Sequence, residues 1–185
     1  LDLMRFARGG AEVTGIELSE TALSLARQYF ESEGRATTFE RMDGEAMSFP
    51  DASFDVVYCH GVFPYAVDPA AIAAECRRVL KPGGEAIFMV YNRRGWLAYI
   101  SKVVKAGLEH DDAPVFRPMS IAEFRRSLAA FQDVKIVPER FPVPTKLHKG
   151  LKGFLYNGLF VPGFNLIPRF LVRRLGWHLM AYCRG

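Results

Sequence analysis

The sequence predicts an α/β protein, a single domain over residues 1–185 built on a doubly wound, mostly parallel sheet. Over the first 91 residues, short apolar segments of strand character alternate with segments whose apolar residues repeat at helical spacing. Such alternation is typical of parallel strands joined by right-handed helical crossovers. A chain of 185 residues with 50% hydrophobic content is long enough to bury one sizeable core.

The first half of the chain supplies most of these elements. Gly9 and Gly10 close the helix that ends at Arg8. Ser19 is suited to cap a helix that runs to about Glu33. The expected elements are helices at 1–8, 20–33 and 69–80, and strands at 12–17, 37–41, 55–60 and 85–91, with Lys81, Pro82, Gly83 and Gly84 ending the third helix.

After Tyr91 the regular alternation stops. Ser120 is suited to cap a helix to about Ala130, and strands are expected at 134–137 and 177–183. Residues 92–118 form a polar and aromatic stretch of uncertain structure, and residues 140–175 are long and irregular by strand–helix standards.

Cysteine content and apolar runs limit the class of protein. Cys59, Cys76 and Cys183 are too few and too scattered for a disulfide framework, so we expect buried apolar side chains in a reducing, cytoplasmic compartment. The longest apolar run, 151–172, is broken by Lys152, Asn157, Pro162 and Pro168 and is not expected to span a membrane. A metal site at 110–112, a His-Asp-Asp sequence, is rejected because no second cluster completes a set of ligands.

The ends of the predicted strands hold the candidate binding residues. In an open parallel sheet, ligands bind beyond the carboxyl ends of the strands. Glu17 ends one strand, and a carboxylate there can accept hydrogen bonds from both hydroxyls of a ribose. Asp43 follows the next strand and could accept a hydrogen bond from an adenine amino group, although Asp43-Gly44 by itself is more typical of a turn.

Two segments and the strand after them resemble a known family. They are VTGIELSETALSLA at 13–26 and DGEAMSFPDASFDVVYCHGVFPYAVDPAAIAAECRRVLKPGG at 43–84. They resemble class I S-adenosylmethionine-dependent methyltransferases of methyltransferase type 11, the ubiquinone and menaquinone biosynthesis kind, and the resemblance covers about residues 3–91. The resemblance implies a Rossmann-like sheet. It also implies that Glu17 binds the ribose of the cofactor, that Leu18 packs on the adenine and that Asp43 binds the adenine amino group. The backbone of Gly44 and Glu45 would lie beside the adenine ring, and Cys59 and His60 would lie along the methionine part.

The family's first motif has no counterpart in this sequence. That motif, a strand leading into a GxGxG loop, would stand before Leu1, and Gly9-Gly10 cannot replace it because they follow the first helix instead of opening it. The resemblance therefore implies an N-terminal truncation that lacks the central strand, between the strands ending at Glu17 and His60. We expect weak or absent binding of S-adenosylmethionine by the 185 residues alone.

No catalytic residue is predicted, since an activated sulfonium needs mainly alignment with its acceptor. Tyr65, in an FPY sequence where relatives often carry paired histidines, and Tyr91 are the substrate candidates. His60 is as well suited to an orienting or space-filling role as to proton transfer.

The second half of the chain is strongly basic. Residues 1–90 carry a net charge of −6 and residues 91–185 carry +10, which indicates an anionic neighbour. We expect lid or substrate insertions at 92–118 and 140–175, where this fold commonly carries them. Their mixture of aromatics and bases fits a lid over an apolar substrate, a surface resting on anionic lipid, or a core excursion with a solvated basic edge. Nucleic acid is disfavoured because large aliphatics separate the bases.

The sequence predicts S-adenosylmethionine-dependent methyl transfer to a small apolar or amphipathic molecule. The alternative is a non-catalytic accessory or binding domain with the same fold. A nicotinamide-dependent oxidoreductase would share the acid at the strand end, but no Tyr-x-x-x-Lys spacing occurs.

Overall fold

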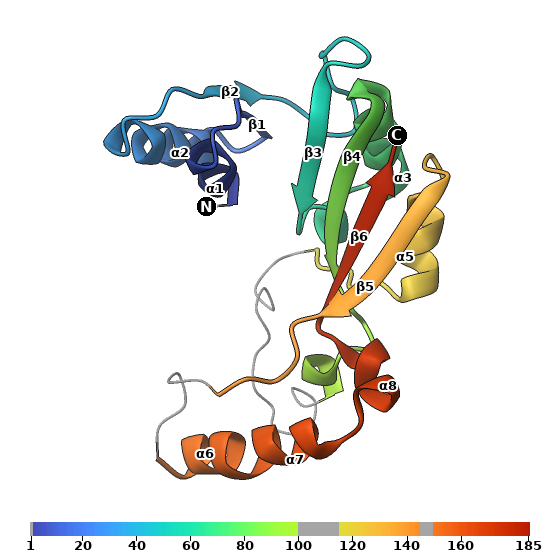
Figure 1. Ribbon diagram of the computed structural model, residues 1–185. Coiled ribbons are helices and arrows are strands. Elements are labelled where there is room, and N and C mark those ends of the chain that lie inside the picture. The colour runs from blue at the N-terminus through green and yellow to red at the C-terminus, as the bar shows by residue number, and fades with distance from the viewer. Residues whose placement is uncertain (1, 100–114, 145–149) are drawn as a thin grey trace.

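The computed structural model describes residues 2–99, 115–144 and 150–185 and contains two sheets (Figure 1). The smaller sheet pairs β1 (Thr14–Glu17) with β2 (Thr38–Arg41) in parallel. It packs with α1 (Asp2–Arg8) and α2 (Glu20–Ser32). Ser19 caps α2 as predicted, because its side chain accepts a hydrogen bond from the Ala22 amide.

The larger sheet has the strand order β3-β4-β6-β5. β3 (Phe54–His60) and β4 (Leu80–Tyr91) are parallel, whereas β6 (His178–Arg184) runs antiparallel to β4 and to β5 (Asp133–Glu139). The predicted α/β class is confirmed, with β6 reversing the direction within an otherwise parallel arrangement.

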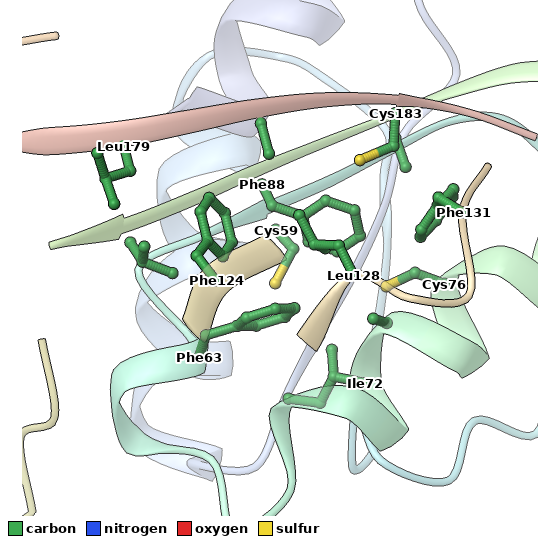
Figure 2. Close-up of a cluster of buried hydrophobic side chains, with 14 of the residues drawn as sticks. Cys59, Phe63, Ile72, Cys76, Phe88, Phe124, Leu128, Phe131, Leu179 and Cys183 are labelled. Carbon is green, nitrogen blue, oxygen red and sulfur yellow. The ribbon is translucent and has the colours of Figure 1, made fainter. Parts of the chain in front are cut away.

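One face of the larger sheet carries the main core. Helices α3 (Pro69–Val79) and α5 (Ile121–Ser127) cover this face, where Phe63, Phe88 and Phe124 lie among aliphatic side chains (Figure 2). All three cysteines are free and buried in this core, as expected from their scattered positions. Phe63 belongs to η1 (Phe63–Tyr65), a short 3-10 turn after β3.

The strands expected on either side of the central strand belong to separate sheets. β1 pairs only with β2 and β3 only with β4 among the strands of the described residues. α1 connects the two parts, since the Tyr58 hydroxyl donates to Asp2 Oδ2 at 3.2 Å and the Phe6 ring lies 5.3 Å from that of Tyr58. An open cavity of about 450 Å³ lies here, lined by Asp2, Arg5, Phe6, Gly9, Ala11 and Tyr58.

Two predictions of local structure need correction. β4 begins at Leu80 instead of residue 85, because Leu80 pairs with Phe54 ahead of an irregular turn in which Gly83 has φ +77°. The segment expected to be irregular is helical from residue 150. It contains α6 (Gly150–Phe154), the π-helix η2 (Leu155–Phe160), α7 (Val161–Leu166), α8 (Arg169–Val172) and η3 (Arg173–Leu175).

Within the described residues, no helix combines the length and the apolar character that crossing a membrane requires. In the insertion expected at 92–118, residues 100–114 lie outside the described residues. The rejected metal position at 110–112 therefore also lies outside them.

Candidate functional site

Glu17 ends β1 with an exposed carboxylate. Its Oε1 accepts hydrogen bonds from the backbone amides of Leu18 and Ser19 at 2.9 and 3.0 Å. These bonds orient the carboxyl group at the strand end, and Oε2 makes no hydrogen bond to any described residue. Leu18 is 56% exposed beside it. The pair therefore offers an acceptor oxygen next to an apolar surface.

Asp43 lies in the loop that follows β2, next to the Glu17 strand end. The Met42 amide donates to the Glu17 carbonyl at 3.3 Å, and Arg41 Nε donates to the Leu18 carbonyl at 3.1 Å. The Asp43 Oδ1 accepts from the Glu45 amide at 2.9 Å, which shows the turn expected for Asp43-Gly44. These contacts join the loops that carry the two predicted cofactor-binding acids.

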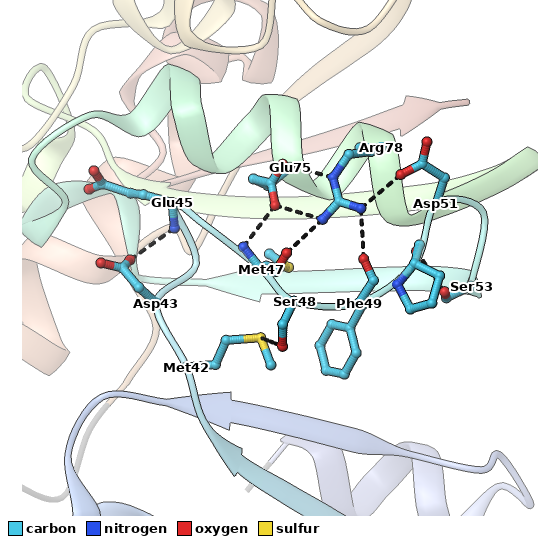
Figure 3. A network of polar contacts seen from close by, with 11 residues as sticks. Met42, Asp43, Glu45, Met47, Ser48, Phe49, Asp51, Ser53, Glu75 and Arg78 are labelled. Carbon is cyan, nitrogen blue, oxygen red and sulfur yellow. Dashed lines mark hydrogen bonds and ion pairs between the residues drawn. The ribbon is translucent and has the colours of Figure 1, made fainter.

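Arg78 on α3 fixes the rest of this loop (Figure 3). Its guanidinium donates to the carbonyls of Met47 and Phe49 and forms ion pairs with Asp51 and Glu75. Because Arg presents several donors in a rigid plane, one side chain can hold several acceptors at fixed angles. The hydrogen bonds with Arg78 also hold the pKa of Glu75 below its ordinary value.

The same loop is tied to the start of α3 by Glu45. Its Oε1 accepts from the backbone amides of Val67 and Asp68 at 2.9 and 3.0 Å. The Glu45 side chain is therefore bound within the protein, as its amide is to Asp43. The contacts of Arg78 and Glu45 with this loop were not identified from the sequence. The available signal was the presence of an acid in the loop and a base in the helix that follows it.

Cys59 and His60 end β3, but their side chains point to different surroundings. Cys59 lies in the main core, where burial raises the pKa of its thiol to about 12, so a binding role would fall to its backbone. His60 is exposed beyond the core. Its ring stacks on that of Tyr58 with centroids 5.7 Å apart and meets His178 edge to face at 5.9 Å.

His178 was missed by the sequence reasoning. It pairs with Tyr91 across the β4–β6 ladder, and because β6 is antiparallel its first residue lies at the carboxyl end of β4. Arg140 Nη1 lies 2.9 Å from His178 Nε2, which must accept because a guanidinium only donates. A polar residue at the start of a reversed strand was the signal that could have identified it.

The charge state of His60 follows from its surroundings. The contacts with Tyr58 and His178 shield part of the His60 ring from water, and this loss of solvation, and then the nearby Arg140 charge, lower the pKa of His60 against the opposing effect of Asp2. The His60 imidazole is therefore mainly neutral at pH 7.

The two substrate candidates differ in exposure. Tyr65 is 37% exposed, with its ring 5.8 Å from Phe116. Tyr91 is 7% exposed and packs against Phe116, Trp177 and His178, so its ring is a wall of this aromatic cluster more than a surface group. The described residues contain no group of three potential metal ligands.

Comparisons with known proteins bear on the family and the fold of this chain. Residues 2–88 match the family model described as a methyltransferase domain. The ubiquinone biosynthesis O-methyltransferase of Thiobacillus denitrificans is 36% identical over 127 residues, which are 63% of this chain and 54% of that protein. The corresponding protein of Aromatoleum aromaticum is 33% identical over 129 residues. The chain thus spans about half the length of the curated relatives it matches.

Solved structures share the fold at low sequence identity. A Thermotoga maritima methyltransferase described as a possible histamine N-methyltransferase has a TM-score of 0.65 and 20% identity, over 97% of this chain and 75% of that one. The [4+2]-cyclase SpnF has a TM-score of 0.63 and 18% identity, over 98% and 69%. The matches confirm the resemblance to class I methyltransferases, while a cyclase of this fold illustrates that the fold does not fix the reaction.

Proposed function

We propose that this chain, which carries a methyltransferase domain match over residues 2–88, uses S-adenosylmethionine to methylate a small apolar or amphipathic molecule. One observation carries the proposal above all. The Glu17 carboxylate is oriented by two backbone amides at a strand end and keeps an oxygen toward solvent beside exposed Leu18. A carboxylate in this position can accept hydrogen bonds from the two hydroxyls of a ribose.

The residues present fit the nucleoside end of the cofactor. Glu17 would accept from the ribose hydroxyls and Leu18 would lie on the adenine. Asp43 would accept from the adenine amino group, since Arg41 and Met42 join its loop to the Glu17 strand end. Glu45 and Arg78 hold the other side of that loop against α3. Cys59 and His60 would border the methionine part at the end of β3.

The open edges of β1 and β3 fit the entry of a further strand with a glycine-rich loop. Such a loop would supply backbone amides for the methionine carboxylate and amino groups, which no predicted residue of this chain supplies. We expect the cofactor to bind tightly only when that segment is present.

When bound, S-adenosylmethionine supplies an activated methyl group, so the chain's task is to position the acceptor. Tyr65 and Phe116 present aromatic surface, and the buried Tyr91 ring packs between Phe116 and His178 behind it. This surface suits an apolar acceptor, and a neutral His60 can accept a proton from an acceptor hydroxyl. The names of the curated relatives make hydroxylated, quinone-like molecules the first class to test.

The alternative is an accessory domain that keeps the fold without catalysis. The separation of β1 from β3 favours this alternative if no further strand enters between them.

The deciding experiment is calorimetric titration with S-adenosylhomocysteine. It uses the 185-residue chain and an extended protein, the full product of the gene that encodes this chain. We expect weak binding by the first and tight binding by the second, with Glu17→Ala weakening the latter by about fivefold or more, the scale of a lost hydrogen bond to a charged group.

Glu12→Ala is the matched control, because Glu12 is an exposed acid before the same strand. Absence of binding by the extended protein would overturn the enzyme assignment and favour the accessory domain. Equal losses for Glu12→Ala and Glu17→Ala would remove Glu17 from the site.

A further inference from the structure

The helical run from residue 150 to 166 is apolar on two opposite faces. α6, η2 and α7 follow one another without a break in this run. A helix that is apolar all round is expected to be buried on all sides. Here, described residues cover only one of the two faces.

The inner face is fixed on an aromatic cluster. Phe160 lies 5.9 Å from Trp96 and 5.6 Å from Tyr156, measured between ring centroids, and Phe164 lies 5.9 Å from Phe160. Trp96 is held in turn by a hydrogen bond from its Nε1 to the Arg140 carbonyl at 2.8 Å. The contacts of Phe160 and Phe164 with Trp96 orient the run and determine which residues face outward.

The outer face exposes large apolar side chains at helical spacing. Leu151, Leu155, Leu159 and Leu166 fall on one side of the run, and Leu166 is 85% exposed. Phe170 in α8 extends the surface and is 77% exposed. We call these five residues the outer apolar face. Large apolar side chains that gather on one exposed surface commonly mark an interaction site, whereas single exposed ones do not.

The charge around this face selects its partner. The described side chains between residues 150 and 177 include three bases, Arg169, Arg173 and Arg174, and no acid. Arg173 and Arg174 are exposed just beyond α8. A second copy docked face to face would bring two such basic segments together with no acid of either segment to offset them, which is unfavourable. A partner with an apolar interior and a negatively charged surface could contact both the apolar side chains and the bases.

We propose that the outer apolar face and the bases beside it rest on an anionic membrane surface. The leucines and Phe170 would enter the boundary between headgroups and acyl chains, and Arg173 and Arg174 would lie among anionic headgroups. The described helices are too short to span a bilayer, so the contact is peripheral. The inference does not depend on methyl transfer.

Vesicle flotation tests the proposal with the chain itself. One set of vesicles contains phosphatidylcholine alone, and the other contains phosphatidylcholine mixed with phosphatidylglycerol. We expect binding to the mixed vesicles that weakens as salt is added, and little binding to phosphatidylcholine alone.

Two variants address the two parts of the surface. Leu166→Glu with Phe170→Glu should lower partitioning by roughly tenfold or more, because a charge replaces each inserted side chain. Arg173→Gln with Arg174→Gln should lower it by roughly fivefold for each charge. Leu25→Glu is the matched control, because Leu25 is 62% exposed on α2, away from this surface, and should leave partitioning unchanged.

Sedimentation equilibrium without lipid tests whether a second copy of the chain covers the outer apolar face instead. A dimer that Leu166→Glu with Phe170→Glu dissociates would overturn the proposal in favour of a second copy. It would also be overturned by no vesicle binding, by equal binding to both kinds of vesicle, or by an equal loss in Leu25→Glu. Unchanged circular dichroism spectra establish that each variant is folded.

Discussion

Asn92 is a buried polar residue, 1% exposed, that joins the end of β4 to the start of β6. Its Nδ2 donates to the carbonyls of Arg174 and Gly176 at 3.0 and 2.8 Å, and its Oδ1 accepts from the Arg94 amide at 3.0 Å. One side chain thus satisfies three backbone groups that secondary structure leaves unpaired. It also fixes where the segment before β6 meets the strand ends.

Replacing Asn92 by Ala should lower the free energy of unfolding by about 1–3 kcal/mol, because buried backbone groups would lose their partners. Urea denaturation followed by circular dichroism measures the change. Asn165→Ala is the control, since Asn165 is exposed on α7. Similar values for the two variants would show that water replaces the Asn92 contacts at no cost.

Glu123 stabilises α5 through charged hydrogen bonds. It forms a capping box with Ser120 and an ion pair with Arg93. The hydrogen bonds from the Ser120 hydroxyl and amide, followed by that from Arg93, lower the pKa of Glu123 to about 2. A depressed pKa contributes stability that is present above the unfolded value, about 4.5, and is lost as pH falls through about 2.

The variant Glu123→Gln should therefore be less stable than the parent at pH 7, by no more than about 1 kcal/mol because the side chain is partly exposed. The difference should shrink as pH falls from about 4.5 to about 2. Urea denaturation at a series of pH values measures it, with Glu31→Gln on the exposed side of α2 as control. A difference independent of pH would contradict the assignment to the ionised carboxylate.

At the scale of elements, the junction of β5 and β6 depends on close backbone approach. A Cβ at Gly176 would lie 2.6 Å from the backbone nitrogen and oxygen of Glu139. Next to it, the Trp177 amide donates to the Arg140 carbonyl. A side chain at residue 176 would therefore push β5 away from the segment that leads into β6.

Gly176→Ala should lower the thermal unfolding midpoint strongly, because backbone cannot move aside as a flexible side chain can. Gly163→Ala is an informative control, since a Cβ there meets nothing within 4 Å and Ala favours helix by about 1 kcal/mol. The two variants should shift the midpoint in opposite directions in a calorimetric scan. A rise for Gly176→Ala would show that the junction relaxes freely.

Sequence patterns located most elements because local signals and tertiary structure agree there. Ser19 and Ser120 cap the helices they were expected to cap, and the strands ending at Glu17 and His60 end there. The helices after residue 150 were missed because apolar residues on both faces, interrupted by Gly and Pro, hide the helical period. The clamp by Arg78 and the position of His178 depend on contacts between distant segments, which periodicity does not report.

At the scale of the whole molecule, the described residues form three hydrophobic clusters of different size. Met4, Ala7, Val13 and Phe30 form the small core of the first lobe, which we define as residues 2–41. This lobe has a two-stranded sheet and contacts β3 mainly through α1, as Phe6 and Asp2 meet Tyr58. The second lobe, residues 54–99, 115–144 and 150–185, contains the four-stranded sheet, the main core and the aromatic cluster around Trp96 and Phe164.

Backbone amides of β1 and β2 should therefore exchange with deuterium faster than those of β4 and β6. A two-stranded sheet with a small core opens at lower free energy than a central strand paired on both sides. Hydrogen exchange followed by mass spectrometry measures both regions in one sample. Equal opening free energies would show that the chain unfolds as one cooperative unit.

The burial of Cys59, Cys76 and Cys183 in the main core makes each thiol a chemical clock. Burial raises the pKa of each thiol, to about 12 for Cys59 and Cys183, so little reactive thiolate exists while the core stays closed. The first lobe and residues 150–172 contain no cysteine. The rate at which an alkylating reagent consumes the thiols thus times the opening of one core, undisturbed by motion elsewhere in the chain.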